Sequence, residues 1–175
     1  MKKLKHLLFV PVAFFFSVNL TVAAPPQMQD TSRHLYDRVM EEYKHKDYEA
    51  ALAGFRLFLE LHKQSSLAAN AQYWIGECHY RLGHYKEALK SFYDVVSYYP
   101  LSPKLAASSL KIAQTHTKMK DHEQARMMYE RVIDQYPDSP EAEIARKALE
   151  TSADRNEPAV QPTEQLSSGN RDDDR

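Results

Sequence analysis

The feature that most constrains this sequence is a pattern that recurs every 37 residues. The stretch HYKEALKSFYDVVSYYP begins at His84, and DHEQARMMYERVIDQYP begins at Asp121. Few letters are identical, yet the alanine, aromatic, valine, tyrosine and proline positions coincide, and a third copy, DYEAALAGFRLFLELH, begins at Asp47. A fixed period of this length is typical of a solenoid whose repeats stack on their neighbours.

Each copy predicts a pair of helices. Apolar residues recur at spacings of three and four between Tyr85 and Tyr99, which indicates one amphipathic helix. The preceding stretch AQYWIGECHYRL has the same period and ends just before Gly83, a residue that commonly caps a helix C-terminus. We therefore predict three helical hairpins, followed by a last helix from Pro140 to Glu150 that covers the final apolar face.

Prolines punctuate the hairpins. Pro100 and Pro137 end two of them, and each is followed closely by a serine–proline pair, at residues 102–103 and 139–140. Serine can accept a hydrogen bond from a free amide at a helix start, and proline suits the first helical turn because its missing N–H is not needed there. Both pairs are therefore predicted to open the next helix.

Small residues fall where the two helices of a hairpin should come closest. A glycine inside a helix, such as Gly76, costs about 1 kcal/mol relative to alanine, so a close helix contact is the expected reason for it. Because Val39 takes this position in the first repeat, we expect that repeat to pack less tightly. The residues predicted to shape the hairpins are Gly76, Ala51, Ala88, Ala125, Phe92, Pro100 and Pro137.

The two ends of the sequence differ from its middle. Lys2, Lys3 and Lys5 precede an apolar run that is short for a membrane span, which predicts a cleaved secretory signal peptide over residues 1–23. We expect a short linker over 24–32, the repeat domain over 33–150, and a disordered acidic tail over 151–175. No cysteine lies near the cleavage region, so no stable membrane anchor is expected.

Composition argues against several classes of function. A net charge of −1 and a pI near 6.7 predict no basic face for nucleic acid. Neither an HExxH nor a Cys-x-x-Cys motif is present, and no catalytic, metal-binding or cofactor-binding residues are predicted, so we expect a protein that is not an enzyme. Cys78, the only cysteine, and Trp74, the only tryptophan, are both interpreted as packing residues.

A hairpin with these small, aromatic and proline positions resembles the tetratricopeptide repeat (TPR). The resemblance implies an all-α fold, a right-handed α-solenoid of three TPR helical hairpins plus a C-terminal capping helix. In TPR proteins the first helices line a concave groove that binds a protein or peptide partner. Carried onto this chain, the groove residues are Tyr36, Met40, Tyr43, Lys44, Tyr73, Glu77, Tyr80, Arg81, Leu110, Gln114, Thr117 and Lys118.

Two interpretations of these residues remain open at this stage. Tyrosines such as Tyr43 and Tyr80 suit peptide binding because they combine a broad apolar face with a hydroxyl, and we favour this interpretation over the alternative that they pack between hairpins. The basic row of Lys44, Arg81 and Lys118 could hold an acidic partner, or it could complement the dipoles at helix C-termini.

A narrower resemblance is carried by AQYWIGE from Ala71 and by the two Tyr-Pro-x-Ser-Pro turns. These are similar to the C-terminal TPR domain of the YbgF/CpoB family of the Tol-Pal system. That resemblance implies an exported, periplasmic adaptor of the cell envelope and cell-division machinery, with a TolA-like partner. The alternatives are a BamD-like scaffold for outer-membrane protein assembly and a passive oligomerisation module, and the oligomeric state is left open.

Overall fold

The computed structural model describes the backbone of residues 26–156 and the side chains of residues 31–151. This part of the chain contains seven helices and no strand. They are α1 (Pro26–Lys44), α2 (Tyr48–Leu61), α3 (Ala68–Arg81), α4 (Tyr85–Tyr98), α5 (Leu105–Lys118), α6 (His122–Gln135) and α7 (Pro140–Asn156). The predicted all-α fold of three hairpins and one last helix is confirmed.

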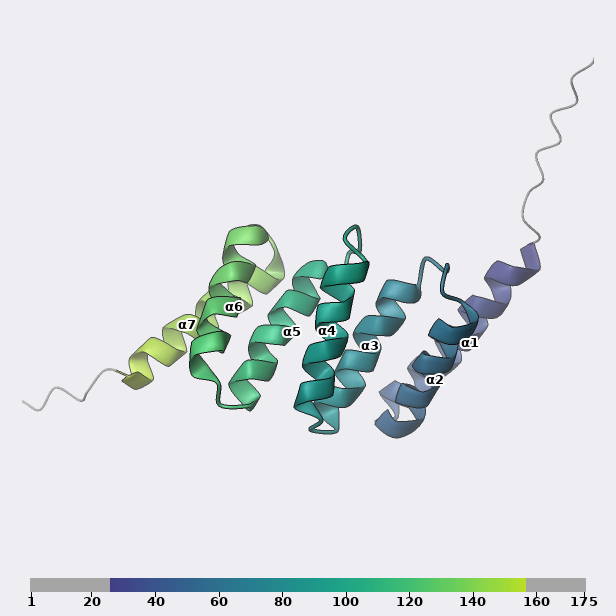
Figure 1. Ribbon diagram of the computed structural model, residues 1–175, viewed down its shortest axis with the longest axis horizontal. Coiled ribbons are helices and arrows are strands. Elements are labelled where there is room, and N and C mark those ends of the chain that lie inside the picture. The colour runs from purple at the N-terminus through teal and green to yellow at the C-terminus, as the bar shows by residue number, and fades with distance from the viewer. Residues whose placement is uncertain (1–25, 157–175) are drawn as a thin grey trace, which may run out of the picture.

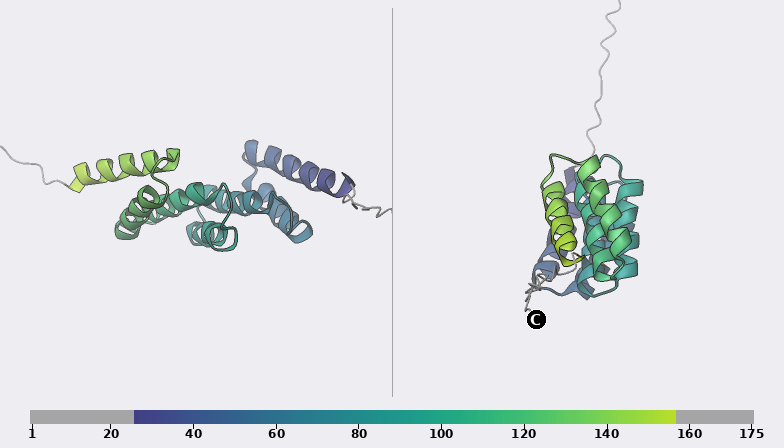
Figure 2. Two further views of the ribbon diagram at one scale, coloured as in Figure 1. Left: turned by 90° about the horizontal axis from the view of Figure 1, so that it is seen from above. Right: turned by 90° about the vertical axis from the view of Figure 1, so that its left-hand side faces the viewer.

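The helices form two layers. In Figure 1, α2, α4 and α6 lie in front of α1, α3, α5 and α7, and each helix packs on the one before it and the one after it. Seen from above, α1 and α7 stand at opposite ends on the same side of the array, whereas α2, α4 and α6 lie toward the other side (Figure 2). Because the contacts run between the helices of one hairpin and between adjoining hairpins, the molecule is built as a one-dimensional stack.

Two apolar clusters form the core. The first surrounds Phe55 and Phe58 and is formed by helices α1, α2 and α3. The second surrounds Phe92, Val95 and Val132 and is formed by the five helices from α3 to α7. All five of these side chains are fully buried. Trp74 on α3 packs against both clusters, so it connects the first hairpin with the rest of the stack.

The predicted close contact at Gly76 is present. A Cβ atom at this position would lie only 2.6 Å from Cε1 of the Phe92 ring, which faces it from α4. Any larger side chain would therefore push the two helices apart. Ala51 and Ala88 are completely buried, and Ala125 is 4% exposed, as expected for small residues between packed helices.

In the first hairpin the large residue lies on the first helix and the glycine on the second, which is the reverse of the second hairpin. Val39 on α1 is larger than its equivalent Gly76, but Gly54 lies opposite it on α2, where a Cβ would be 2.5 Å from Val39 Cγ2. Val39 is only 1% exposed. The expectation of looser packing in this repeat overlooked Gly54, because the glycine that makes room for Val39 lies on the facing helix.

One turn geometry recurs at the end of every hairpin's first helix. Gly83 has a positive φ of 79°, its N–H donates to the carbonyl of Tyr80, and the N–H of His84 donates to the carbonyl of His79. This pair of bonds is the Schellman motif, and it confirms the predicted cap. Lys46 and Lys120, at the equivalent positions, also have positive φ, of 65° and 63°.

The serine–proline pairs behave differently from one another. Ser139 Oγ accepts a hydrogen bond from the Ala142 N–H at 3.1 Å, and α7 begins at Pro140 as predicted. By contrast, Ser102 Oγ accepts from the Lys104 N–H at 3.0 Å and so closes a local turn. Helix α5 therefore begins at Leu105 rather than at Pro103, because the serine hydroxyl satisfies an amide of the turn instead of one in the helix.

Both terminal helices are longer than predicted. Helix α1 begins at Pro26, so residues 26–32 of the expected linker are helical, since proline suits a first turn and no glycine or proline follows it there. Helix α7 continues from the expected end at Glu150 to Asn156, and the next proline is Pro158. The predicted signal peptide over 1–23 and the rest of the acidic tail, 157–175, lie outside the described residues. Within the described residues, no helix is both long and apolar enough to span a membrane.

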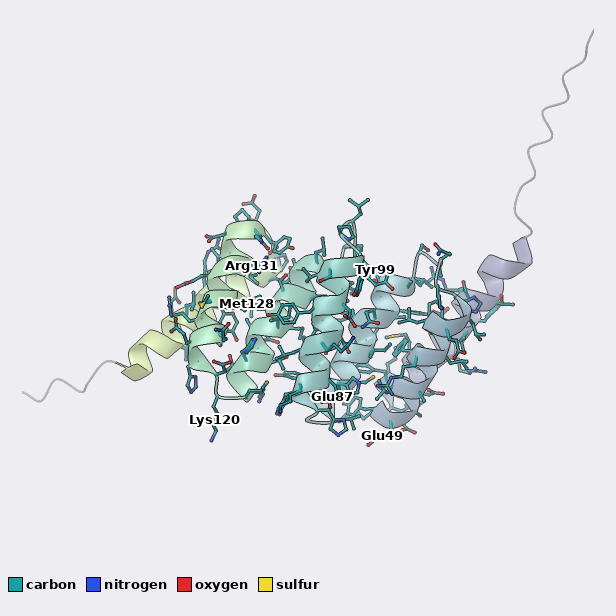
Figure 3. All side chains as sticks on the ribbon, in the orientation of Figure 1. Glu49, Glu87, Tyr99, Lys120, Met128 and Arg131 are labelled. Atoms are coloured by element: carbon teal, nitrogen blue, oxygen red, sulfur yellow. The ribbon has the colours of Figure 1, made fainter. Side chains whose placement is uncertain are left out.

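The left-handed cap residues generate a stability prediction. Lys120 lies in the turn between α5 and α6 (Figure 3), and exchanging a left-handed lysine for glycine removes the steric conflict of its Cβ with the following carbonyl. Lys120→Gly and Lys46→Gly should each raise the free energy of unfolding by roughly 0.5–1 kcal/mol in urea titrations. Lys118→Gly, two residues earlier and inside α5, is the matched control and should lower it; equal effects at both positions would contradict this account.

Candidate functional site

The first helices of the repeats bring aromatic and cationic side chains together on one surface. Tyr43 comes from α1, and Trp74, Tyr80 and Arg81 come from α3. Lys104 comes from the turn before α5, and Lys111 comes from the middle of that helix. We call the surface formed by these six residues the inner face. All six are partly or fully exposed, so it is accessible.

The centre of the inner face is an ion pair between two repeats. Lys111 Nζ on α5 lies 2.7 Å from Glu77 Oε1 on α3, and the two side chains are 18% and 4% exposed. The Tyr43 hydroxyl on α1 donates to Glu77 Oε2 at 3.3 Å. One carboxylate therefore connects three successive first helices, and it is shielded from water.

Aromatic side chains surround this ion pair. The Trp74 Nε1–H donates to the Tyr36 hydroxyl at 2.8 Å, and the Tyr43 and Trp74 ring centres are 4.7 Å apart. Burial, together with the neighbouring Glu77 carboxylate, raises the pKa of Tyr43 to about 12. The Tyr43 hydroxyl consequently stays protonated and available as a donor at physiological pH.

Two lysines lie over aromatic rings. Lys104 Nζ is 4.9 Å from the centre of the Tyr73 ring and 5.9 Å from that of Trp74, while Lys111 Nζ is 5.1 Å from that of Tyr80. These are cation–π distances. Within the described part of the chain Lys104 forms no ion pair, so its charge is held in place by rings without being neutralised.

Sequence reasoning did not include Trp74, Lys104 or Lys111 in the site. Trp74 and Lys111 occupy equivalent positions one repeat apart, and Asp37 occupies that position in the first repeat. This position therefore carries an acidic, an aromatic and a basic residue in successive repeats. Such variation indicates that the position does not serve packing alone. Lys104 lies in the turn before α5, where the repeat pattern makes no assignment.

Some of the predicted groove residues belong to the core instead. Tyr36 and Tyr73 are each 8% exposed and Leu110 is 5% exposed, so little of their surface is accessible. Tyr36 packs edge-on against Phe55 and Phe58, at ring distances of 5.7 and 5.6 Å. For these three residues the structure favours packing between helices over contact with a partner.

The predicted basic row is not continuous. Lys44 Nζ pairs with Glu41 on its own helix at 2.7 Å, whereas Arg81 and Lys118 are exposed. The pKa of Arg81 is raised, first by its hydrogen bond to the Tyr43 hydroxyl, which places the guanidinium beside the ion pair of the inner face. Of the three, Arg81 is the residue that the structure joins to this site.

The remaining predicted groove residues are at the edges. Met40 and Gln114 are half-buried, and Met40 packs against the first apolar cluster. Thr117 Oγ1 donates to the Ala113 carbonyl at 3.1 Å and lies 3.3 Å from the Tyr129 hydroxyl on α6, so it supports the third hairpin.

The sole cysteine is part of the packing. Cys78 is completely buried, and burial raises the pKa of its thiol to about 12, which keeps it in the unreactive thiol form. This agrees with the structural role predicted for it. Among the side chains that the structure describes, no group of three or more His, Cys, Asp or Glu residues is arranged to hold a metal ion.

Comparison with known proteins gives a family match over the middle of this chain. Residues 67–138 match the family model described as tetratricopeptide repeat. This region contains the whole of the second and third hairpins, α3 to α6. A search of curated proteins found no match.

Solved structures with the same fold include two bacterial proteins and one human domain. PcrH from Pseudomonas aeruginosa is 20% identical with a TM-score of 0.61, covering 71% of this chain and 92% of PcrH. SycD, a type III secretion translocator chaperone of Yersinia enterocolitica, is 17% identical with a TM-score of 0.61, covering 70% and 90%. The second TPR domain of human RPAP3, in complex with the HSP70 peptide SGPTIEEVD, is 17% identical with a TM-score of 0.56, covering 72% and 98%. At these identities the likeness establishes the fold.

The buried ion pair generates a prediction about the stability of the inner face. Lys111→Met should lower the free energy of unfolding by about 3 kcal/mol, because it leaves the Glu77 carboxylate buried without its cation. Glu77→Leu combined with Lys111→Met should recover most of that loss, because no uncompensated charge remains. Urea unfolding of the two single variants and the double variant measures this coupling, and additive effects would show that the two side chains are independent.

Proposed function

We propose that this protein is a non-catalytic adaptor whose inner face captures a segment of a partner protein. The observation that carries the proposal is the cluster of accessible aromatic rings and cations around the Glu77–Lys111 ion pair. Aromatic and arginine side chains dominate the binding energy of protein interfaces because they offer large contact areas at low entropy cost. The inner face combines these properties on three neighbouring helices.

The chemistry of the inner face favours a segment that contains an acidic residue. Lys104 is positioned by two rings and is not neutralised by any described carboxylate, and Arg81 hydrogen-bonds a hydroxyl rather than an acid. A carboxylate from a partner would pair with these cations while its neighbouring side chains contact Trp74 and Tyr80. The Glu77–Lys111 pair is already satisfied, so it serves as a rigid support.

Proteins with the same fold provide support from their own complexes. PcrH has been solved with the chaperone-binding regions of PopB and of PopD, and the RPAP3 domain with an HSP70 peptide. Each of these TPR proteins binds a segment of another protein. This chain shares their fold, and its inner face has the composition of a protein-binding surface.

For the cellular setting, we propose export to the periplasm and a role with the Tol-Pal envelope and cell-division machinery, including a TolA-like partner. The support is the amino-terminal pattern over residues 1–23 and the resemblance of the repeat sequences to the YbgF/CpoB family. N-terminal sequencing of protein recovered from the periplasm should begin at Ala24, and recovery of the intact N-terminus from the cytoplasm would overturn the export proposal.

A double substitution tests the binding surface. Tyr80→Ala with Arg81→Glu should weaken capture of the partner from cell-envelope extract at least about tenfold, because it removes an aromatic contact and reverses a charge. The helical content measured by circular dichroism should stay unchanged, because both residues are at least partly exposed.

The matched control places the same two changes elsewhere. Tyr98→Ala with Arg131→Glu alters exposed residues of α4 and α6, which lie in the other layer of the solenoid. This variant should capture the same partner as the wild-type protein. Loss of capture in the control, with retention in the inner-face variant, would place the binding surface on α4 and α6 instead.

A further inference from the structure

A second surface feature lies on the opposite side of the solenoid from the inner face. Helices α2, α3 and α4 enclose a pocket of about 320 Å³, which we call the outer pocket. It opens on the side formed by α2 and α4, which faces the viewer in Figure 3, where Glu87 is labelled near the lower end of α4. Leu59 and Ile75 provide its apolar walls, and the rest of the lining is polar.

One end of the outer pocket is satisfied internally. Lys90 Nζ donates to Asp94 Oδ2 at 2.8 Å, and Gln72 Nε2 lies 3.3 Å from both Asp94 Oδ2 and the Ser91 carbonyl. The charges of Lys90 and Asp94 therefore balance each other. This end has no evident need for a ligand.

The other end contains groups that remain unpaired. An Arg56 Nη2 nitrogen lies 3.1 Å from His79 Nε2, and because a guanidinium can only donate, the imidazole must accept there. His79 is then neutral with its hydrogen on Nδ1, in line with the lowering of its pKa by burial and by Arg56. This Nδ1 is buried without a hydrogen-bond partner, and the His79 side chain is only 5% exposed.

Arg56 and Glu87 carry the two charges that remain at this end. Among the described residues neither side chain forms an ion pair, and both are exposed at the surface. Arg56 is oriented by its bond to the buried imidazole, which leaves the remaining guanidinium N–H groups free to donate. The Arg56 guanidinium is therefore held in place more firmly than the Glu87 carboxylate.

The next pair of repeats shows that the fold does not require this polar arrangement. There Tyr93 replaces Arg56 and Met128 replaces Ser91, and the Tyr93 hydroxyl contacts Met128 Sδ at 4.0 Å. The equivalent of Lys90 is Met127. Tyrosine and methionine side chains thus take these positions one repeat later, whereas His116 repeats the histidine of His79. Of the two residues, Arg56 is the one specific to the first junction.

We propose that the outer pocket binds an aliphatic carboxylate, with the Arg56 guanidinium as its anchor. Arginine matches a carboxylate with two parallel hydrogen bonds, and Leu59 and Ile75 can contact the methylene groups behind it. The ligand is a carboxylate on a chain of two or three carbons, either a glutamate side chain of a docked protein segment or a free dicarboxylate. Glu87 opposes this ligand electrostatically and limits its affinity.

The binding experiment uses two probes that separate these sources. Glutarate and the blocked peptide acetyl-Ala-Ala-Glu-Ala-Ala-amide are titrated into the full chain, and shifts of the Arg56 Nε–H and the His79 backbone amide signals are followed by NMR. Binding of the peptide, with no response to the same peptide carrying glutamine, identifies a protein segment as the source. A response to glutarate alone identifies a free dicarboxylate, and no response to either probe overturns the proposal.

Two variants give opposite expected results. Arg56→Tyr introduces the residue found at this position in the next repeat. It should lower the affinity for whichever probe binds by about tenfold or more, because the bidentate donor is lost. Glu87→Gln should raise the affinity for the same probe by about threefold, because a like charge near the bound carboxylate is removed. A purely structural role for Arg56 would not produce opposite signs, and tightening by Arg56→Tyr would overturn the proposal.

The inner-face variant Tyr80→Ala with Arg81→Glu serves as the independence control. It should leave the response of the outer pocket unchanged, since these residues do not line it. If this variant lowered the affinity for the probe as much as Arg56→Tyr does, the outer pocket would not be a separate site. The two proposals can therefore succeed or fail independently.

Discussion

The rest of the structure depends on how closely the two helices of each hairpin approach. In the first hairpin Val39 fills the space left by Gly54, and in the second the Phe92 ring fills the space left by Gly76. A small residue on one helix faces a large one on the other, and which helix carries the small residue changes from repeat to repeat. This exchange of volume keeps the helices in contact while the sequence varies, and the contact keeps α1, α3 and α5 close enough for Tyr43, Glu77 and Lys111 to meet.

Features that depend on a few neighbouring residues could be predicted from the sequence. The 3.6-residue period located the helices, Gly83 marked a left-handed cap, and the burial of Cys78 followed from its place beside the small residue Gly76. Features that depend on the facing helix could not. Gly54 has meaning only when Val39 lies opposite, and Ser102 could have bonded either to the turn or to the helix.

The functional surfaces illustrate the same limit. Tyr43, Tyr80 and Arg81 were identified from their repeat positions, whereas Lys104 joins the inner face from a turn that the repeat pattern does not describe. Positions that recur in all repeats maintain the fold, and positions that differ, such as Trp74 against Lys111 or Arg56 against Tyr93, give each junction its own chemistry. Function in a repeat protein is therefore best sought in the departures from its repeat.

The most direct test of this account is a double-mutant cycle across Val39 and Gly54, followed by urea unfolding. Gly54→Ala in the wild-type background should destabilise the protein by about 2 kcal/mol, because the new Cβ meets Val39. In the Val39→Ala background the same change should cost nothing or stabilise the protein by up to about 1 kcal/mol, the helix-propensity gain of alanine over glycine. An equal effect of Gly54→Ala in both backgrounds would contradict the claim that complementary side-chain volumes hold the facing helices together.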